Sequence, residues 1–254
     1  MSKRPFDVVG WSPVLAGVTV GLAAMLAGCG DAGSDAPIAT AQTVTESVAA
    51  PIDEDRLAAV IRLLDSLPAD RRPAFTPSME PFDGSALPSE SLVAAHRRRY
   101  AAAMEPAPHA AVWRDDPAIA TALDREHLAA DELARTLTRV GCAHQVSHLT
   151  DLNELAADTR LNLLRLCEQW DATAGVTDGM ASRNRSLLGE AIGELVALDE
   201  YLTLLQAVPE SNRRIAHAHW PQLKTFLPPT QLRDQLERIV EVDFVPTVLP
   251  VGGP

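Results

Sequence analysis

Apolar residues recur in steps of three and four along the middle of the chain, which is the spacing of one face of an α-helix. The clearest seam follows Asp151 and consists of Leu152, Leu155, Thr159, Leu163, Leu166 and Trp170. A second seam ends before Pro209 and consists of Leu188, Ile192, Leu195, Leu198, Leu202 and Leu205. Both are too short for an extended coiled coil, so the pattern predicts antiparallel helices packed in a bundle.

Capping residues suggest where these helices begin. Asp53 is a good N-cap, and the flanking Ile52 and Leu57 have the spacing of a hydrophobic staple, so a first helix should run from Asp53 to near Pro68. Asp151 and Glu154 have the spacing of a capping box and should open the helix of the clearest seam.

Four further segments are predicted to be helical, two of them as main helices and two as short C-terminal helices. The ranges are 89–104, 117–140, with Pro117 at the first helical position, and two short helices at 212–220 and 230–242. His127 falls on the apolar stripe of the 117–140 segment. We interpret it as a core or boundary residue rather than a ligand.

Residues 68–88 contain five prolines and two phenylalanines, Phe75 and Phe82, and are not expected to form a helix. The favoured interpretation is a loop that the two aromatic rings hold against the bundle. The alternative is a proline-rich segment that docks a partner, but the proline spacing matches no repeated recognition motif.

Composition supports an all-α class. Hydrophobic residues make up 46 % of the chain and aromatic residues only 4 %, which is low for a β-sandwich or barrel. The net charge of −12 would repel a phosphate backbone, so nucleic acid is not an expected partner. The basic cluster from His96 to Arg99 fans out around a helix, and we interpret it as a solvated face rather than an anion site.

The N-terminus has the plan of an export signal. Lys3 and Arg4 precede an uncharged apolar run from Trp11 to Gly28, as in a secretory signal peptide. The residues that end the run, Leu26-Ala27-Gly28-Cys29, closely resemble the lipobox of bacterial lipoproteins. An uncleaved signal anchor is the alternative, because the run approaches the length of a membrane span.

The lipobox resemblance implies cleavage before Cys29 and lipidation of its thiol, and it covers residues 1–29 only. Two or more acyl chains would hold the protein permanently on a membrane of the cell envelope. Gly30, rather than Asp, follows the cysteine, which favours the outer membrane facing the periplasm over the inner membrane if the host has two membranes.

This interpretation divides the chain into four parts. Residues 1–28 are a signal peptide, and residues 29–51, which are small and polar, are a flexible lipidated tether. Residues 52–242 are a helical domain of about five main helices plus short C-terminal ones, and residues 243–254 are an extended tail.

Cys142 and Cys167 remain after acylation of Cys29, and export would place them where disulfides form. A disulfide is the favoured interpretation, although it requires the chain between Ala143 and Thr150 to run back extended before the next helix begins. Two buried thiols are the alternative.

Candidate chemistry is sparse. His144 and His148 have the i,i+4 spacing of two helical zinc ligands, but Gln145 stands where a zinc protease needs its glutamate base. His217 and His219 are conceivable further ligands that nothing in the sequence brings close. The sequence contains no catalytic triad motif, phosphate-binding loop or haem attachment motif, so no cofactor and no catalytic residue are predicted. A protein without enzymatic activity is the favoured interpretation.

The main hypothesis is a lipid-anchored helical module that binds or scaffolds an envelope protein or an apolar ligand. The rival hypothesis is a metal-binding or enzymatic domain centred on His144 and His148. A structural spacer without a ligand is a third possibility.

Overall fold

The computed structural model describes residues 41–73, 75, 82–173, 179–227 and 232–240, and the side chains of 41–43 and 179–182 are not among them. These residues form an all-α structure that contains no strand, which confirms the predicted class. The predicted signal peptide, Cys29, tether residues 29–40 and tail residues 243–254 lie outside the described residues.

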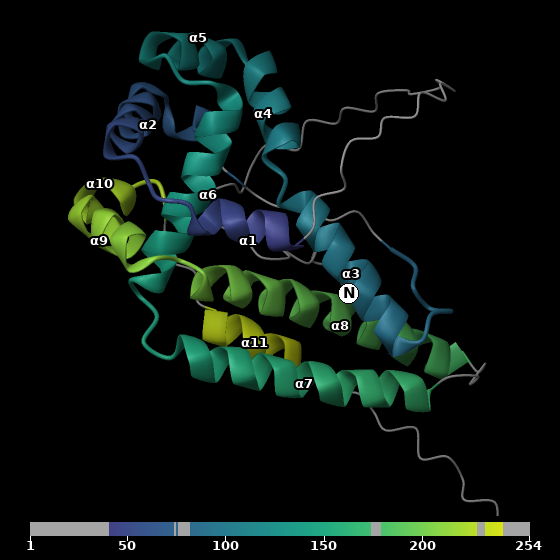
Figure 1. Ribbon diagram of the computed structural model, residues 1–254. Helices are drawn as coiled ribbons and strands as arrows, with labels where there is room; N and C mark the ends of the chain where they lie inside the picture. Colours follow the sequence, from purple (N-terminus) through teal and green to yellow (C-terminus); the bar gives the residue numbers. More distant parts are fainter. Residues whose placement is uncertain (1–40, 74, 76–81, 174–178, 228–231, 241–254) are drawn as a thin grey trace, which may run out of the picture.

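One group of helices surrounds the long helix α8, in the lower half of Figure 1. α8 packs against its antiparallel neighbour α7 and also contacts α3 and α11. The group consists of α3 (Ser89–Ala103), α7 (Leu152–Ala172), α8 (Gly179–Gln206) and α11 (Leu232–Val240). The apolar seams predicted for α7 and α8 are largely buried here, because each faces the other helices of the group.

A second group of helices is built on α6, which runs from the upper part of Figure 1 toward α8. α6 contacts α1, α2, α4, α8 and α9, so it joins the two halves of the molecule. The group consists of α1 (Ala41–Ala49), α2 (Glu54–Ser66), α4 (Pro106–Asp115), α5 (Pro117–Glu126), α6 (Ala130–Val146), α9 (Glu210–Ala218) and α10 (Trp220–Leu223).

Several predicted helix ends are confirmed. Asp53 caps α2 by accepting hydrogen bonds from the backbone N–H groups of Asp55 (2.9 Å) and Arg56 (3.1 Å). α3, α9 and α11 lie where short or main helices were expected, and Pro117 stands at the start of α5. Asp116, before that proline, caps α5 in the same way as Asp53 caps α2.

The single helix predicted over 117–140 is wrong, because the structure divides it at His127. His127 adopts the left-handed conformation with φ 53°, and its N–H donates to the carbonyl of Asp124. This ends α5, and the chain turns before α6 begins at Ala130. His127 is exposed, so its interpretation as a core or boundary residue is also wrong.

The predicted tether is too long. Residues 41–49 form α1, which packs on α6 and α8, with Val44 and Val48 buried. Two valines at i,i+4 give this short segment an apolar face, and the neighbouring helices cover it. α4 was not predicted at all.

Asp151 does not act as the side-chain cap that the capping-box pattern predicted. Although it occupies the N-cap position of α7, its carboxylate makes no capping hydrogen bond and instead pairs with Arg233 of α11. Both partners are charged in the pair with the guanidinium, whereas only the carboxylate is charged in a capping bond, so the ion pair with Arg233 is favoured over capping.

The proline-rich segment contributes no α-helix within its described residues, only the 3₁₀ turn Ala69–Arg71. Phe75 is buried, as expected of an anchoring ring. Phe82 is 40 % exposed and lies edge-on against His96, with the guanidinium of Arg99 over its face.

No helix among the described residues is both long and apolar enough to cross a bilayer.

Candidate functional site

The structure brings His144 and His148 together at the C-terminal end of α6. Their ring centroids are 5.1 Å apart, and both rings contact the indole of Trp220, at 4.5 Å and 4.1 Å. The i,i+4 spacing explains why the rings share a side, but no pattern in the sequence indicated that Trp220, at the start of α10, would cover them. We refer to His144 and His148 as the histidine pair.

The two members of the histidine pair have different surroundings. His144 is 1 % exposed, and burial, helped by the charge of His148, lowers its pKa to about 4. His148 is exposed, and its pKa is lowered by partial burial and by the charge of His217. His217 is therefore near the pair, whereas His219 lies at the C-cap of α9 and has no described contact with it.

Both rings are neutral near pH 7, so each has a nitrogen lone pair available. Within the described part of the chain, however, no group of three or more His, Cys, Asp or Glu side chains is placed to hold a metal ion.

The favoured disulfide is contradicted, because Cys142 and Cys167 are both free. Cys142 is fully buried in α6, near the rings of Tyr100 and Tyr201, and burial raises its pKa to about 12. Cys167 is half-buried on α7 near Asp171 and Arg97. The helices hold the two thiols in different environments, so the chain between them need not double back. Because its pKa is about 12, the Cys142 thiol is unreactive at neutral pH.

The basic cluster does not form an open anion site. Arg97 pairs with Asp199 (3.4 Å) and Glu200 (2.9 Å) of α8, while Arg99 lies over Phe82. Arg98 is exposed. The partners of Arg97 come from another helix rather than from the i,i+4 positions of α3.

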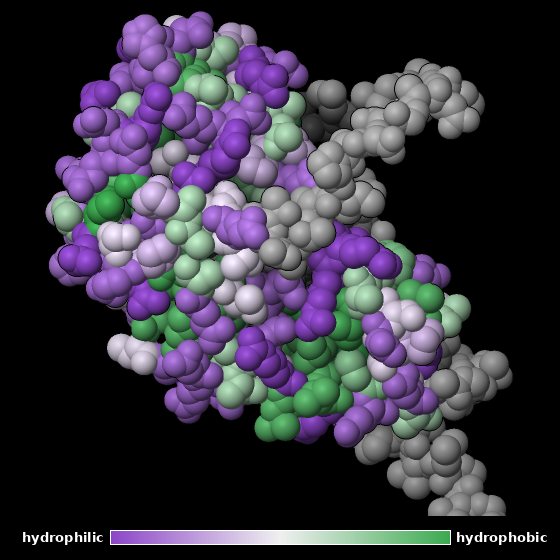
Figure 2. Space-filling view, in the orientation of Figure 1, coloured by the Kyte–Doolittle hydropathy of each residue, from purple (hydrophilic) through white to green (hydrophobic). Residues whose placement is uncertain are grey.

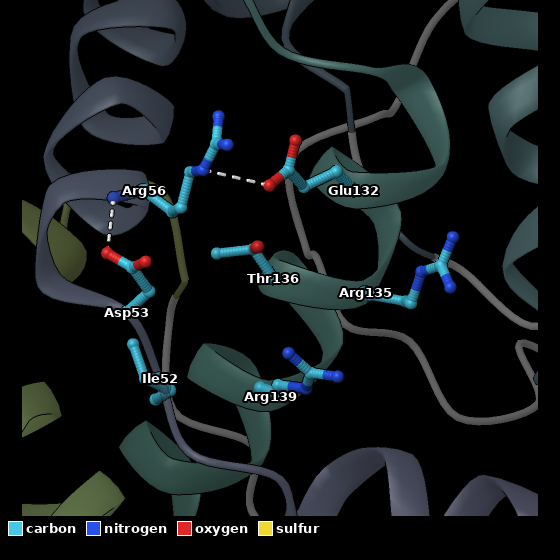
Figure 3. Close-up of a pocket in the computed structure, with 7 residues that line it drawn as sticks. All are labelled: Ile52, Asp53, Arg56, Glu132, Arg135, Thr136 and Arg139. Atoms are coloured by element: carbon cyan, nitrogen blue, oxygen red, sulfur yellow. Dashed lines mark hydrogen bonds and ion pairs between the residues drawn. The ribbon is translucent and has the colours of Figure 1, made fainter.

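A cavity of about 470 Å³ lies where the start of α2 meets α6 (Figure 3). We call it the arginine pocket. Its lining residues are Ile52, Asp53, Arg56, Glu132, Arg135, Thr136 and Arg139. Three come from the segment that enters and begins α2, and four come from successive turns of α6.

The arginine pocket has more positive than negative charge, in a chain whose net charge is −12. Arg56 is balanced, because its Nε lies 3.0 Å from a carboxylate oxygen of Glu132. The carboxylate of Asp53 is occupied by capping α2. Arg135 and Arg139 form no ion pair with any carboxylate of the described residues.

Backbone carbonyls hold these two arginines by a single nitrogen each. The Nε of Arg135 donates to the carbonyl of Asp131 (3.2 Å), and the Nε of Arg139 donates to the carbonyl of Ser47 in α1 (2.6 Å). Their terminal amino groups therefore remain available, and Figure 3 shows both side chains extending to the same side of α6. Burial and the charge of Arg135 lower the pKa of Arg139, as expected of two cations held close together without a counterion.

The other surface feature is apolar. Figure 2 shows hydrophobic side chains gathered over α7, the helix on which Leu161 and Leu164 are 60 % and 63 % exposed. Two exposed leucines make only a small apolar surface.

Sequence reasoning missed the arginine pocket. Arg135 and Arg139 have i,i+4 spacing, which places two like charges on one helix face, and that was the one signal available. Comparisons of the chain with protein-family models, with curated proteins and with solved structures find no match.

Proposed function

We propose that this chain is a cell-envelope lipoprotein, anchored through lipid on Cys29, whose helical domain binds an anionic group of another envelope component in the arginine pocket. The anchor rests on the signal and lipobox pattern of residues 1–29. The binding role rests on one observation, which is that Arg135 and Arg139 line a cavity and have no carboxylate partner among the described residues.

Guanidinium groups suit this role because their planar forks match carboxylate and phosphate oxygens. An anion between Arg135 and Arg139 would also relieve the repulsion between the two cations. The proposal narrows the expected partner from any protein or apolar ligand to one that presents a carboxylate or phosphate group.

The anchor is tested by mass spectrometry of the mature protein from cells. We expect an N-terminal fragment that begins at Cys29 and carries acyl chains, and a Cys29→Ala chain should keep its leader and lack the lipid. An unacylated mature start at any other residue would overturn the anchor but leave the pocket untouched.

The pocket is tested with inorganic phosphate and a short polyglutamate peptide as probes, by calorimetry on the full chain in detergent. We expect at least one probe to bind the wild type, and Arg135→Gln with Arg139→Gln to weaken that binding at least tenfold. The matched control is Arg98→Gln with Arg165→Gln, which removes the same charge from exposed positions of α3 and α7.

Binding that falls equally in the matched control would show a general charge effect, and absence of binding to both probes in the wild type would also reject the pocket. Higher salt should weaken the bound state, because exposed charges are screened.

A further inference from the structure

The buried member of the histidine pair has unused hydrogen-bonding capacity. His144 is 1 % exposed, yet neither its Nδ1 nor its Nε2 makes a hydrogen bond of ordinary geometry with the described residues. A buried polar group without a partner is costly, and few persist in native structures without a reason. An unmet ring nitrogen is what a metal-binding histidine shows before its metal is present.

The surroundings of His144 also suit a ligand. The main-chain carbonyl of Leu227 approaches the ring closely enough to oppose the lowering of its pKa. Metal-ligating histidines commonly direct one nitrogen at a backbone carbonyl, which leaves the other nitrogen for the metal. The exposed His148 beside it gives an ion access from solvent.

The spacing of the two rings fits one ion. With a metal–nitrogen distance of about 2.0–2.1 Å, two imidazoles in neighbouring positions have ring centroids about 5 Å apart on a tetrahedral ion such as Zn²⁺ and about 4.5 Å apart on a square-planar ion such as Cu²⁺. The centroids of His144 and His148 are 5.1 Å apart, so a metal would require rotation of the rings rather than movement of α6.

We propose that His144 and His148 form a two-histidine site for a divalent transition-metal ion. Because the described residues offer no third protein ligand at this position, water would complete the coordination. Imidazole nitrogen suits Cu²⁺, Zn²⁺ and Ni²⁺, and among these the general order of affinity places Cu²⁺ first. The site is separate from the arginine pocket and does not depend on the proposed anion.

Trp220 provides a direct readout. Its indole contacts both rings, so a Cu²⁺ ion bound between them would lie close enough to quench its fluorescence. The full chain, freed of metal with a chelator, is titrated with Cu²⁺ and, separately, with Zn²⁺, while fluorescence and calorimetry are followed. We expect one Cu²⁺ per chain, quenching that is lost in Trp220→Phe, and weaker binding of Zn²⁺.

His148→Gln is the main test variant, because this side chain is exposed and its replacement leaves the core intact. It should weaken Cu²⁺ binding at least tenfold, and His144→Phe should do the same where circular dichroism shows a folded chain. His219→Gln is the matched control and should bind as the wild type does.

Failure of the wild type to bind Cu²⁺ stoichiometrically would overturn the proposal. So would binding that survives His148→Gln, or binding that His219→Gln weakens equally.

Discussion

Asn212 of α9 and Ile52, which are 160 positions apart in the sequence, are joined by a buried hydrogen bond. The side-chain oxygen of Asn212 accepts from the backbone N–H of Ile52 (3.0 Å), and its amide nitrogen donates to the carbonyl of Ala50 (2.9 Å). Asn212 is 0 % exposed. The Asn212 side chain therefore fixes the segment between α1 and α2 against α9. Ile52, which lines the arginine pocket, lies in this segment.

Replacing Asn212 with Ala should destabilise the fold by about 1–3 kcal/mol, because it leaves the buried N–H of Ile52 and the part-buried C=O of Ala50 without this partner. The measurement is the free energy of unfolding in urea. Asn153→Ala is the control, since Asn153 is exposed and its loss should cost less than about 0.5 kcal/mol. A loss at Asn212 no larger than that of the control would show that water satisfies the freed groups.

Gly193 of α8 allows close approach of His96 from α3. A Cβ atom at position 193 would lie 2.7 Å from Cε1 and 3.0 Å from Nδ1 of His96. We expect Gly193→Ala to reduce the free energy of unfolding by about 1–3 kcal/mol through overpacking. Combining it with His96→Ala should recover most of this loss, so the two substitutions should be strongly non-additive. Simple additivity would show that α3 and α8 separate easily at this point.

His96 should make stability depend on pH. Burial, with a smaller effect of Arg99, lowers its pKa to about 4 from an ordinary value of 6.5. The neutral ring also lies 3.3 Å from Nη1 of Arg99, from which it can accept a hydrogen bond. Between pH 6.5 and 4 the unfolded chain binds a proton at this histidine and the folded chain does not. The contribution of His96 to the free energy of unfolding is therefore fully present above pH 6.5 and decreases as the pH falls from 6.5 to 4.

The size of this loss is about 3 kcal/mol at most. It is measured by comparing urea unfolding of the wild type and His96→Gln across pH 7.5 to 4. The variant should show the shallower pH dependence, whatever its stability at neutral pH. Parallel curves for the two proteins would show that His96 titrates normally in the fold.

Asp199 connects three helices. It is 5 % exposed in α8 and pairs with Arg160 of α7 (2.8 Å) and Arg97 of α3 (3.4 Å). Asp199→Asn should cost about 1–3 kcal/mol, less than a fully buried pair, because both arginines are about half exposed and screened by solvent. Arg160→Gln should cost less, since Arg97 still neutralises the carboxylate. A larger loss for Arg160→Gln than for Asp199→Asn would contradict this arrangement.

The sequence alone was enough to predict the class of the fold and the principal helices. The seams of α7 and α8 and the Asp53 cap of α2 are encoded by residues within a few turns of each other, and helix periodicity and capping act over that range. The shared side of His144 and His148 follows from the same local rule. The division at His127 could not be predicted in this way, because apolar residues keep the same helical spacing on both sides of it.

Only the tertiary structure decided which distant side chains meet. The arginine pocket joins α6 to a segment about 80 positions earlier, Trp220 covers a histidine pair more than 70 positions before it, and Arg233 takes Asp151 from its predicted capping role. The same packing holds Cys142 and Cys167 in different environments as free thiols. The physical reason is that a helical repeat records which face of each helix is apolar, whereas the pairing of polar groups depends on how those faces are finally packed against one another.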